Sequence, residues 1–299
     1  MVQAAPLRSG LQPFPGYRLE RILGRGGFSE VWAAYSPYGE PVALKFLPCD
    51  SSASAAREIR SLQAIRQLEH SHLIRMENVW CYQGYIVVAM EMAEGTLHDL
   101  LEAYMDQAGT PIAPEHVCLV LSDAAGALDF LNTRQHWINE RWVGIQHCDV
   151  KPRNLLLVND LVKVADFGLS SMMTAGIETR YRAGTLDYCA PEVFQGKLSN
   201  HTDQYALAVT YCQLRGGRLP FPDTPSSFDH RYTRPAPDLN MLSPPERSVV
   251  ARALDPVPQN RWPSCGALFN QLCRIVCDGN EPKKPPKGKS GVRQASAVR

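Results

Sequence analysis

The stretch from Ile145 to Leu157 constrains the chain most, because it places three kinds of polar group between two apolar runs. Lys151 lies two residues after Asp149, and Asn154 lies five residues after it. The apolar runs indicate short buried strands, so the polar residues occupy a loop that is held at both ends. A carboxylate can orient a hydroxyl nucleophile, an ammonium can neutralise a phosphate oxygen, and an amide oxygen can bind a hard cation. The loop therefore suggests phosphoryl transfer, as a hypothesis that the rest of the chain must support.

The composition is that of a globular protein. Of the 299 residues, 44% are hydrophobic and 20% are charged, which is enough apolar material for one large domain or two modest ones. The formal net charge of +1 creates no overall field towards nucleic acid or anionic lipid. The five tryptophans form no stacking platform with basic residues. We therefore expect no nucleic-acid partner.

The sequence predicts a cytoplasmic protein without a membrane segment, because it shows neither a signal peptide nor an apolar run of sufficient length. The nine cysteines are then expected as free thiols, since their spacing matches no metal site. Residues 1–16 are expected to form a loose lead-in. Residues 278–299 are expected to form a basic, disordered tail, in which no acid follows Lys283.

The hydrophobic pattern divides the chain into two unlike parts. As far as residue 93 the pattern is mainly that of strands, and beyond residue 94 it is mainly that of helices. The first part has predicted strands at Tyr17–Leu23, Phe28–Tyr35, Pro41–Leu47, Leu73–Tyr82 and Gly84–Met92, and a predicted helix at Ala53–Leu68. The second part has predicted helices at Glu115–Asn132, His201–Leu214, Pro244–Leu254 and Cys265–Cys277, a strand at Leu161–Ala165, an inserted loop at Thr133–Gly144 and a Pro-rich loop at Arg218–Pro237. The expected fold class is α+β, with a small antiparallel sheet lobe and a larger helical lobe.

A glycine-rich turn lies between the first two predicted strands. Gly24, Gly26 and Gly27 precede Phe28 and Ser29, and their lack of side chains lets backbone N–H groups approach phosphate oxygens. Taken alone, an ordinary hairpin turn explains these glycines equally well.

Lys45 ends the otherwise apolar run Val42–Lys45, where a buried ammonium needs a partner of opposite charge. Glu58 borders the apolar face of the next predicted helix and is the expected partner, whereas Glu69 lies at the far end of that helix. Two unrelated surface residues are the alternative, and the surrounding motifs favour the pair.

Asp166 directly follows a predicted strand and begins the sequence Asp166-Phe167-Gly168. Together with Asn154 it would bring a carboxylate and an amide oxygen to neighbouring loops. This pair of oxygen ligands predicts a Mg²⁺ site that carries a nucleotide.

Three charged residues of the helical part have a structural explanation. Glu192 and Asp203 are followed much later by Arg261. A carboxylate and a guanidinium in a helical lobe are expected to form a structural ion pair.

In this order, the motifs resemble those of the eukaryotic-type Ser/Thr protein kinases, in the form often found in bacteria, and the resemblance extends from Tyr17 to Cys277. It implies a protein kinase domain at residues 17–277, with lobes of about 17–93 and 94–277. It also implies ATP and Mg²⁺ as cofactors and serine or threonine hydroxyls of proteins as substrates. The residues that carry it are the glycine-rich turn, Val42–Lys45, Glu58, His147-Cys148-Asp149, Asn154, Asp166–Gly168 and Ala190-Pro191-Glu192.

The resemblance assigns catalytic roles to six residues. Lys45, paired with Glu58, would hold the α- and β-phosphates of ATP. Asp149 would orient the substrate hydroxyl, and Lys151 would stabilise the transferred phosphoryl group. Thr185 would hydrogen-bond the catalytic loop. The metal ligands would be Asn154 and Asp166.

The resemblance also implies the nucleotide contacts. The glycine-rich turn would cover the phosphates, Met90 would be the gatekeeper, and the hinge after it would bind adenine through its backbone. The implied residues are Gly24, Gly26, Gly27, Phe28, Ser29, Val31, Ala43, Lys45, Met90, Glu91, Met92, Ala93 and Leu156.

Two residues depart from the family pattern. Ser29 stands where a third glycine is usual. Cys148 replaces the arginine of the usual His-Arg-Asp motif, which normally pairs with a phosphorylated residue of the activation loop, and a thiol cannot supply that charge. We therefore predict that activity does not require phosphorylation of Thr174, Thr179 or Tyr181.

Two other functions remain open at this point. A pseudokinase scaffold would bind nucleotide or partners without catalysis, and Cys148 is the main feature in its favour. A small-molecule phosphotransferase would share the core, but such relatives generally lack the Ala-Pro-Glu segment and the contact expected of Thr185.

Overall fold

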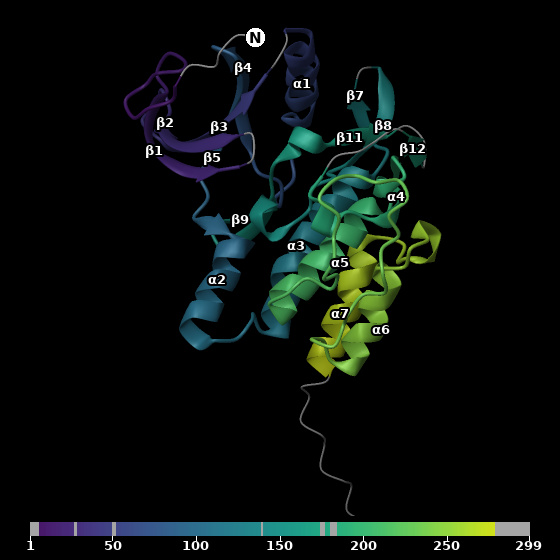
Figure 1. Ribbon diagram of the computed structural model, residues 1–299. Helices are drawn as coiled ribbons and strands as arrows, with labels where there is room; N and C mark the ends of the chain where they lie inside the picture. Colours follow the sequence, from purple (N-terminus) through teal and green to yellow (C-terminus); the bar gives the residue numbers. More distant parts are fainter. Residues whose placement is uncertain are drawn as a thin grey trace, which may run out of the picture.

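The chain forms a sheet lobe with one helix and a larger lobe of helices (Figure 1). The two lobes meet at the segment that follows β5 (Tyr85–Glu91). The predicted α+β, two-lobed arrangement is confirmed. The computed structural model describes residues 6–26, 29–49, 52–138, 140–173, 177–179 and 184–278.

The first lobe is built on an antiparallel sheet with the strand order β1-β2-β3-β5-β4. Its central strand β3 is buried on both faces, because successive side chains point into two different cores. Val42, Leu44 and Phe46 pack in the small core of the sheet, and Ala43 packs in the large core shared with the other lobe. The elements are β1 (Arg18–Arg25), β2 (Glu30–Tyr35), β3 (Pro41–Pro48), α1 (Ser52–Ile65), β4 (Met76–Tyr82) and β5 (Tyr85–Glu91).

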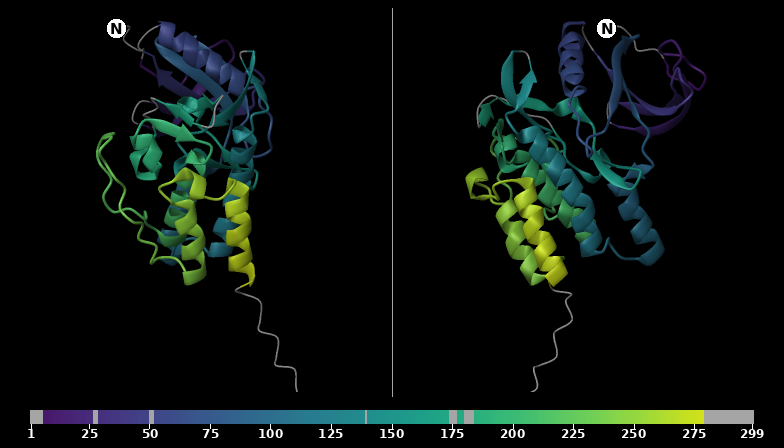
Figure 2. Two further views of the ribbon diagram at one scale, coloured as in Figure 1. Left: turned by 90° about the vertical axis from the view of Figure 1, so that its right-hand side faces the viewer. Right: turned by 180° about the vertical axis from the view of Figure 1, so that it is seen from behind.

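The second lobe packs its helices around α3 and α5, with short strand pairs on the side that faces the sheet (Figure 2). Its helices are α2 (Leu97–Ala108), α3 (Pro114–Asn132), α4 (Pro191–Phe194), α5 (Thr202–Gly216), α6 (Pro244–Ala253) and α7 (Cys265–Asp278), with 3₁₀ turns at Pro152–Asn154, Phe167–Leu169, Leu186–Tyr188 and Pro258–Asn260. Its strands are β6 (Gly95–Thr96), β7 (His136–Ile138), β8 (Arg141–Gln146), β9 (Leu155–Val158), β10 (Leu161–Val164), β11 (Ser171–Met173), β12 (Ile177–Thr179) and β13 (Lys197–Ser199).

Two elements differ from the sequence prediction. Helix α2 was not predicted, although a capping box marks its start: Thr96 Oγ1 accepts from Asp99 N at 3.1 Å, and Asp99 Oδ2 accepts from Thr96 N at 2.8 Å. The expected loop at Thr133–Gly144 contains the β7–β8 hairpin. Its mixture of polar and aromatic residues concealed the alternation of a strand.

The expected loose lead-in also differs, because residues 6–16 pack on the sheet. Gly10 N donates to Leu19 O at 2.8 Å, and Leu19 N donates to Leu11 O at 2.9 Å. Leu7 and Leu11 contact the small core. The predicted basic tail lies outside the described residues from 279 onwards. Within the described ranges, no helix is both long enough and apolar enough to cross a membrane.

Candidate active site

The β9–β10 hairpin brings Asn154 and Asp166 together. Leu155 pairs with Val164 in this hairpin, so the residues just before β9 and just after β10 lie opposite each other. Ala165 N donates to Asn154 O at 2.9 Å, which continues the pairing by one step. Asp166 is the next residue, and its φ of +70° turns the chain out of the strand. The two predicted metal ligands therefore lie at the same end of one hairpin.

Asp149 is the centre of a dense hydrogen-bond network. Its Oδ1 accepts from Thr185 Oγ1 at 2.7 Å and from Thr185 N at 3.0 Å. Its Oδ2 accepts from Lys151 Nζ at 2.8 Å and from Asn154 Nδ2 at 2.9 Å. Lys151 Nζ also donates to Thr185 Oγ1 at 2.6 Å. The Thr185 hydroxyl therefore accepts from the ammonium of Lys151 and donates to the carboxylate of Asp149. Four of the predicted catalytic residues thus form one connected unit.

This network leaves no spare acceptor on the carboxylate. An ionised carboxylate offers about four lone-pair positions, and four donors surround Asp149. Its side chain is only 8% exposed, so these bonds fix its direction. A hydroxyl that approaches Asp149 must replace one of the present donors. The Lys151 side chain is the more exposed of the ion pair, at 21%.

The side chains of His147 and Asp203 form hydrogen bonds with the backbone of the loop that carries Asp149. Asp203, buried on α5, accepts from His147 N at 2.7 Å and from Cys148 N at 2.8 Å. The His147 ring accepts from Asp149 N at 3.3 Å through Nδ1, so its Nε2 carries the hydrogen that reaches Ala165 O at 2.8 Å. The hydrogen bond to Ala165 O ties the loop to the chain just before Asp166.

Burial raises the pKa of Asp203 above its ordinary value, although His147 and the two backbone N–H donors oppose the rise. The sequence left open which of Glu192 and Asp203 pairs with Arg261, and in the structure Asp203 binds the backbone of the loop instead. Asp203 organises the catalytic loop, and no nearby motif in the sequence indicated that role.

The side chain of Cys148 is buried in the large core, and its backbone contacts the chain before Thr185. Its φ is +69°, and its Sγ lies 3.4 Å from Gln146 O. The carbonyl oxygen of Cys148 faces Gly184, where a Cβ atom would come within 2.7 Å of it. Gly184 itself has a φ of +111°, so both its conformation and its surroundings require glycine. The catalytic loop and the chain before Thr185 therefore touch backbone to backbone.

Lys45 pairs with Asp166 and not with Glu58, which corrects the sequence prediction. Lys45 Nζ lies 2.5 Å from Asp166 Oδ1, and no ion pair within 4.0 Å joins Lys45 to Glu58, although both are described residues. Glu58 belongs to α1, whereas Lys45 lies within β3 and Asp166 follows the end of β10.

The pKa values of Asp166 and Glu58 shift in opposite directions. Burial raises the pKa of Asp166, but the Lys45 ammonium and other donors outweigh this, so the pKa lies below its ordinary value. Burial also raises the pKa of Glu58, and the more distant Lys45 offsets it only in part, so that pKa lies above its ordinary value.

The residues predicted to contact adenine gather on the sheet and on β9. Ala43 and Met90 are cross-strand partners of β3 and β5. Val31, Met92 and Leu156 pack against the same core. Gly24, Gly26 and Ser29 flank the turn between β1 and β2, and Gly26 N donates to Ser29 O at 2.7 Å. Gly27 and Phe28 lie outside the described residues, as do Thr174, Tyr181 and the side chain of Thr179.

Asn154 and Asp166 suit a hard cation that also binds phosphate. Asn154 uses its Nδ2 for Asp149, and the structure describes no hydrogen bond to its Oδ1. Among the described residues, no cluster of three or more His, Cys, Asp or Glu could hold a metal ion. A carboxylate and an amide oxygen therefore fit a cation that takes its remaining ligands from water and phosphates.

Comparison with known proteins decides the family. The model of the protein kinase domain matches residues 17–273. The chain belongs to the protein kinase domain family. It is 31% identical over 299 residues to Serine/threonine-protein kinase PknF of Mycobacterium tuberculosis, covering 93% of this chain and 60% of that protein.

Two further relatives come from eukaryotes. The chain is 32% identical over 260 residues to CBL-interacting protein kinase 4 of Oryza sativa, covering 82% of this chain and 54% of that protein. It is 32% identical over 258 residues to the Carbon catabolite-derepressing protein kinase of Candida tropicalis, covering 82% of this chain and 39% of that protein. The chain thus spans about 40–60% of the length of these three relatives. Membership of the family implies the use of ATP and a divalent metal ion in general.

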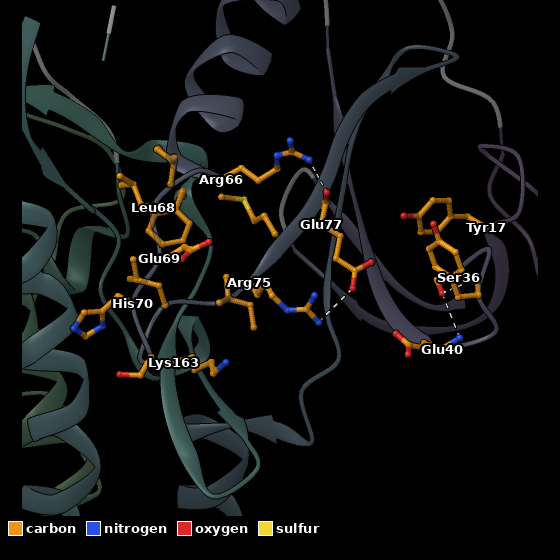
Figure 3. A pocket seen from close by; sticks show the side chains of 17 residues that line it. Tyr17, Ser36, Glu40, Arg66, Leu68, Glu69, His70, Arg75, Glu77 and Lys163 are labelled. Carbon is orange, nitrogen blue, oxygen red and sulfur yellow. Dashed lines mark hydrogen bonds and ion pairs between the residues drawn. The ribbon is translucent and has the colours of Figure 1, made fainter. Parts of the chain in front are cut away.

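A separate cavity of about 880 Å³ lies beside β4, which is an edge strand of the sheet of the kinase domain (Figure 3). Two of its arginines bind Glu77: Arg75 pairs with the carboxylate at 3.5 Å, and Arg66 Nη1 donates to the backbone carbonyl oxygen at 2.6 Å. None of the predicted catalytic, nucleotide-binding or metal-binding residues lines this cavity. Phe167, which follows Asp166, reaches it from the active-site side.

The expected structural ion pair of the kinase domain is formed by Glu192 and Arg261. Arg261 Nη1 and Nη2 donate to the two carboxylate oxygens of Glu192 at 2.9 and 2.8 Å, and the Arg261 side chain is 0% exposed. Ser199 and Thr202 hydroxyls also donate to Glu192. Because a buried pair must have its remaining positions satisfied, this network anchors the end of the segment that begins at Thr185.

Proposed function

We propose that this chain is a Ser/Thr protein kinase that transfers the γ-phosphoryl group of ATP to serine and threonine hydroxyls of protein substrates, with Mg²⁺ as the metal ion. The proposal includes a bacterial type of kinase, a cytoplasmic location and a kinase domain of residues 17–277. The observation that carries it is the connected unit of Asp149, Lys151, Asn154 and Thr185. Such a unit can orient a hydroxyl and neutralise phosphoryl charge without covalent chemistry.

The hydroxyl of the substrate takes the position of one donor on Asp149. Lys151 is the donor that gives way, because its side chain is more exposed than that of Asp149 and can turn towards the incoming phosphoryl group. Thr185 and Asn154 keep the carboxylate in place during this exchange, since they hold one oxygen each. Asp149 then orients the hydroxyl and accepts its proton as the bond from the substrate oxygen to the γ-phosphorus forms and the bond from the γ-phosphorus to the bridging oxygen breaks, with ADP as the leaving group.

Asn154 Oδ1 and the carboxylate of Asp166 would hold Mg²⁺, and Lys45 would bind the phosphates of ATP. When bound, Mg²⁺ would neutralise charge on the phosphate oxygens. Lys45 already contacts Asp166 at 2.5 Å, so an incoming phosphate finds the ammonium beside the metal ligand. The lysine acts as a point charge that can be shared between the carboxylate and a phosphate.

The test is transfer of labelled phosphate from ATP with Mg²⁺ to a generic protein substrate. Asp149→Asn should lower the rate by on the order of 10³-fold, because the amide cannot accept the proton. Lys45→Met should lower it by on the order of 10²–10³-fold through loss of charge at the phosphates. Asp238→Asn and Lys197→Met, at sites away from the network, are the matched controls and should keep the parental rate.

Equal signals from the parent and from Asp149→Asn would contradict the proposal. A folded parent that binds ATP without transferring phosphate would instead indicate the pseudokinase scaffold. Transfer to a small-molecule hydroxyl but not to protein would indicate a small-molecule phosphotransferase. Separating labelled protein from labelled small molecules by gel electrophoresis distinguishes these outcomes.

A further inference from the structure

The loop between α5 and α6 returns along the outer side of the helical lobe and reaches the active-site segment (Figure 2). Most of it is the Pro-rich segment Arg218–Pro237, and the proposed mechanism does not use it. One of its residues, Arg234, is only partly exposed and points its guanidinium at the chain that follows Thr185.

Arg234 binds three carbonyl groups of one short turn. Its Nε donates to Cys189 O at 2.9 Å, and its Nη2 donates to Asp187 O at 3.0 Å and to Leu186 O. These carbonyls belong to the 3₁₀ turn Leu186–Tyr188 and the residue after it. The planar fork of a guanidinium can bind several oxygens at once, which an ammonium cannot reproduce.

Aromatic rings hold the same guanidinium from the other side. Its central carbon lies 4.5 Å from the ring centroid of Phe221, 5.5 Å from that of Phe194 and 5.9 Å from that of Tyr205. In the described part of the chain, no carboxylate lies within ion-pair distance of Arg234. The positive charge is thus directed at carbonyl oxygens and ring faces, and both fix its position.

We propose that Arg234 is a positioning residue for the reaction, acting through the turn Leu186–Cys189 on Thr185 and thereby on Asp149. Thr185 immediately precedes this turn, and Tyr188 N donates to Thr185 O at 3.0 Å. Thr185 in turn gives two hydrogen bonds to Asp149. The rigidity of a loop that touches neither nucleotide nor Asp149 therefore sets the direction of the catalytic carboxylate.

The first test rests on the proposed kinase activity and measures coupling between Arg234 and Thr185. Arg234→Met should lower kcat/KM by on the order of 10–100-fold in the parent, as expected for a small displacement of reacting groups. In a Thr185→Ala background the same change should cost no more than about threefold, because the link is already broken. An equal factor in both backgrounds would indicate general damage and overturn the proposal.

Two variants separate positioning from stability. Arg234→Lys keeps the charge and most of the stem but lacks the fork, so it should recover little of the lost activity. If Arg234→Met does not fold, Arg234→Lys is carried through the same double-mutant cycle. Arg252→Met is the matched control, since Arg252 also binds two carbonyl groups and its central carbon lies 4.1 Å from the ring centroid of Trp262, but it has no contact with the turn Leu186–Cys189 among the described hydrogen bonds. It should leave kcat/KM unchanged.

The second test does not depend on catalysis. Hydrogen exchange of the backbone amides of Thr185, Tyr188 and Cys189 should accelerate in Arg234→Met and stay at the parental rate in Arg252→Met. Unchanged exchange in Arg234→Met would overturn the positioning role. A parent that transfers no phosphate would refute the proposed function, while the exchange measurement would still decide the role of Arg234.

Discussion

The two sides of the active site are built in different ways. On the catalytic-loop side, hydrogen bonds already join Asp149 to Lys151, Asn154 and Thr185, as their proposed roles require. On the nucleotide side, Lys45 binds Asp166, and Glu58 remains beyond ion-pair distance. The first side depends on contacts within one lobe, whereas the second depends on a helix of the other lobe. We infer that the catalytic side is preorganised and that the nucleotide side is completed by movement of α1.

Among the variants that test this comparison, the largest effect is expected from removing Asp203, which supports the preorganised side. Asp203→Ala would leave the N–H groups of His147 and Cys148 buried without their acceptor. We expect a loss of about 2–5 kcal/mol in the free energy of unfolding and on the order of 100-fold in kcat/KM. Urea denaturation and steady-state kinetics measure both. Asp238→Ala, at a residue whose side chain is 41% exposed, is the control. Parental activity in Asp203→Ala would show that the loop that carries Asp149 keeps its geometry without Asp203.

The next largest effect is expected at Thr185. Thr185→Val keeps the shape but removes the hydroxyl that receives from Lys151 and donates to Asp149. The kcat should fall by roughly 10–100-fold with the KM for ATP unchanged, because a buried charged group loses a hydrogen bond. Thr185→Ser retains the hydroxyl and should stay within about threefold of the parent. A raised KM for ATP would mean that the two sides are not separate.

Glu58→Gln tests the incomplete side and should separate activity from stability. If α1 movement brings Glu58 to Lys45 during turnover, the amide should lower kcat/KM by about tenfold, as for loss of one charge-assisted contact. The ligand-free protein should become slightly more stable, by no more than about 2 °C in Tm, because burial raises the pKa of Glu58 and penalises its charged form.

The pH dependence follows from the same shift. Because the pKa of Glu58 is higher in the folded than in the unfolded protein, its contribution is most favourable below the unfolded value of 4.5 and is lost as pH rises through the folded value. The parent and Glu58→Gln should therefore have the same Tm near pH 4 and diverge above it. Thermal unfolding measured across this range would contradict the inference if the difference were constant.

The smallest effect is expected for the activation loop. Replacing Thr174, Thr179 and Tyr181 together by alanine should leave kcat/KM within about threefold, because Cys148 supplies no positive charge for a phosphorylated residue. Phosphate transfer by protein purified after phosphatase treatment is the companion measurement. Loss of activity in a folded triple variant would contradict this prediction. It would indicate that a cation other than the usual arginine binds a phosphorylated residue of the activation loop.

Local spacing explains which parts of the site could be predicted. Asp149, Lys151 and Asn154 lie on one loop, so their sequence positions alone almost fix their mutual distances. The hydrophobic period likewise indicated most strands and the long helices. Helix α2 escaped because its capping box stands in a short, weakly apolar stretch, although Thr96 and Asp99 could have revealed it.

Long-range placement explains what could not be predicted. Asp203 lies 56 residues after His147, and only packing of α5 under the loop brings its carboxylate to that backbone. The Lys45–Glu58 pair was expected from motif order, which cannot state where α1 sits relative to β3. Arg234 lies in a loop without a regular pattern, so its contacts with Leu186–Cys189 follow from the fold alone.

The contact between Gly184 and the carbonyl group of Cys148 has a consequence for sequence drift. Because the contact uses the backbone of residue 148, the side chain there can change without loosening it, within the limits that a φ of +69° sets for branched residues. Position 184 has no such freedom, since any Cβ would meet that oxygen. At residue 148, the backbone carbonyl group makes this contact and the side chain takes no part in it. We therefore infer that a substitution at position 148 can leave the backbone geometry of the catalytic loop in place.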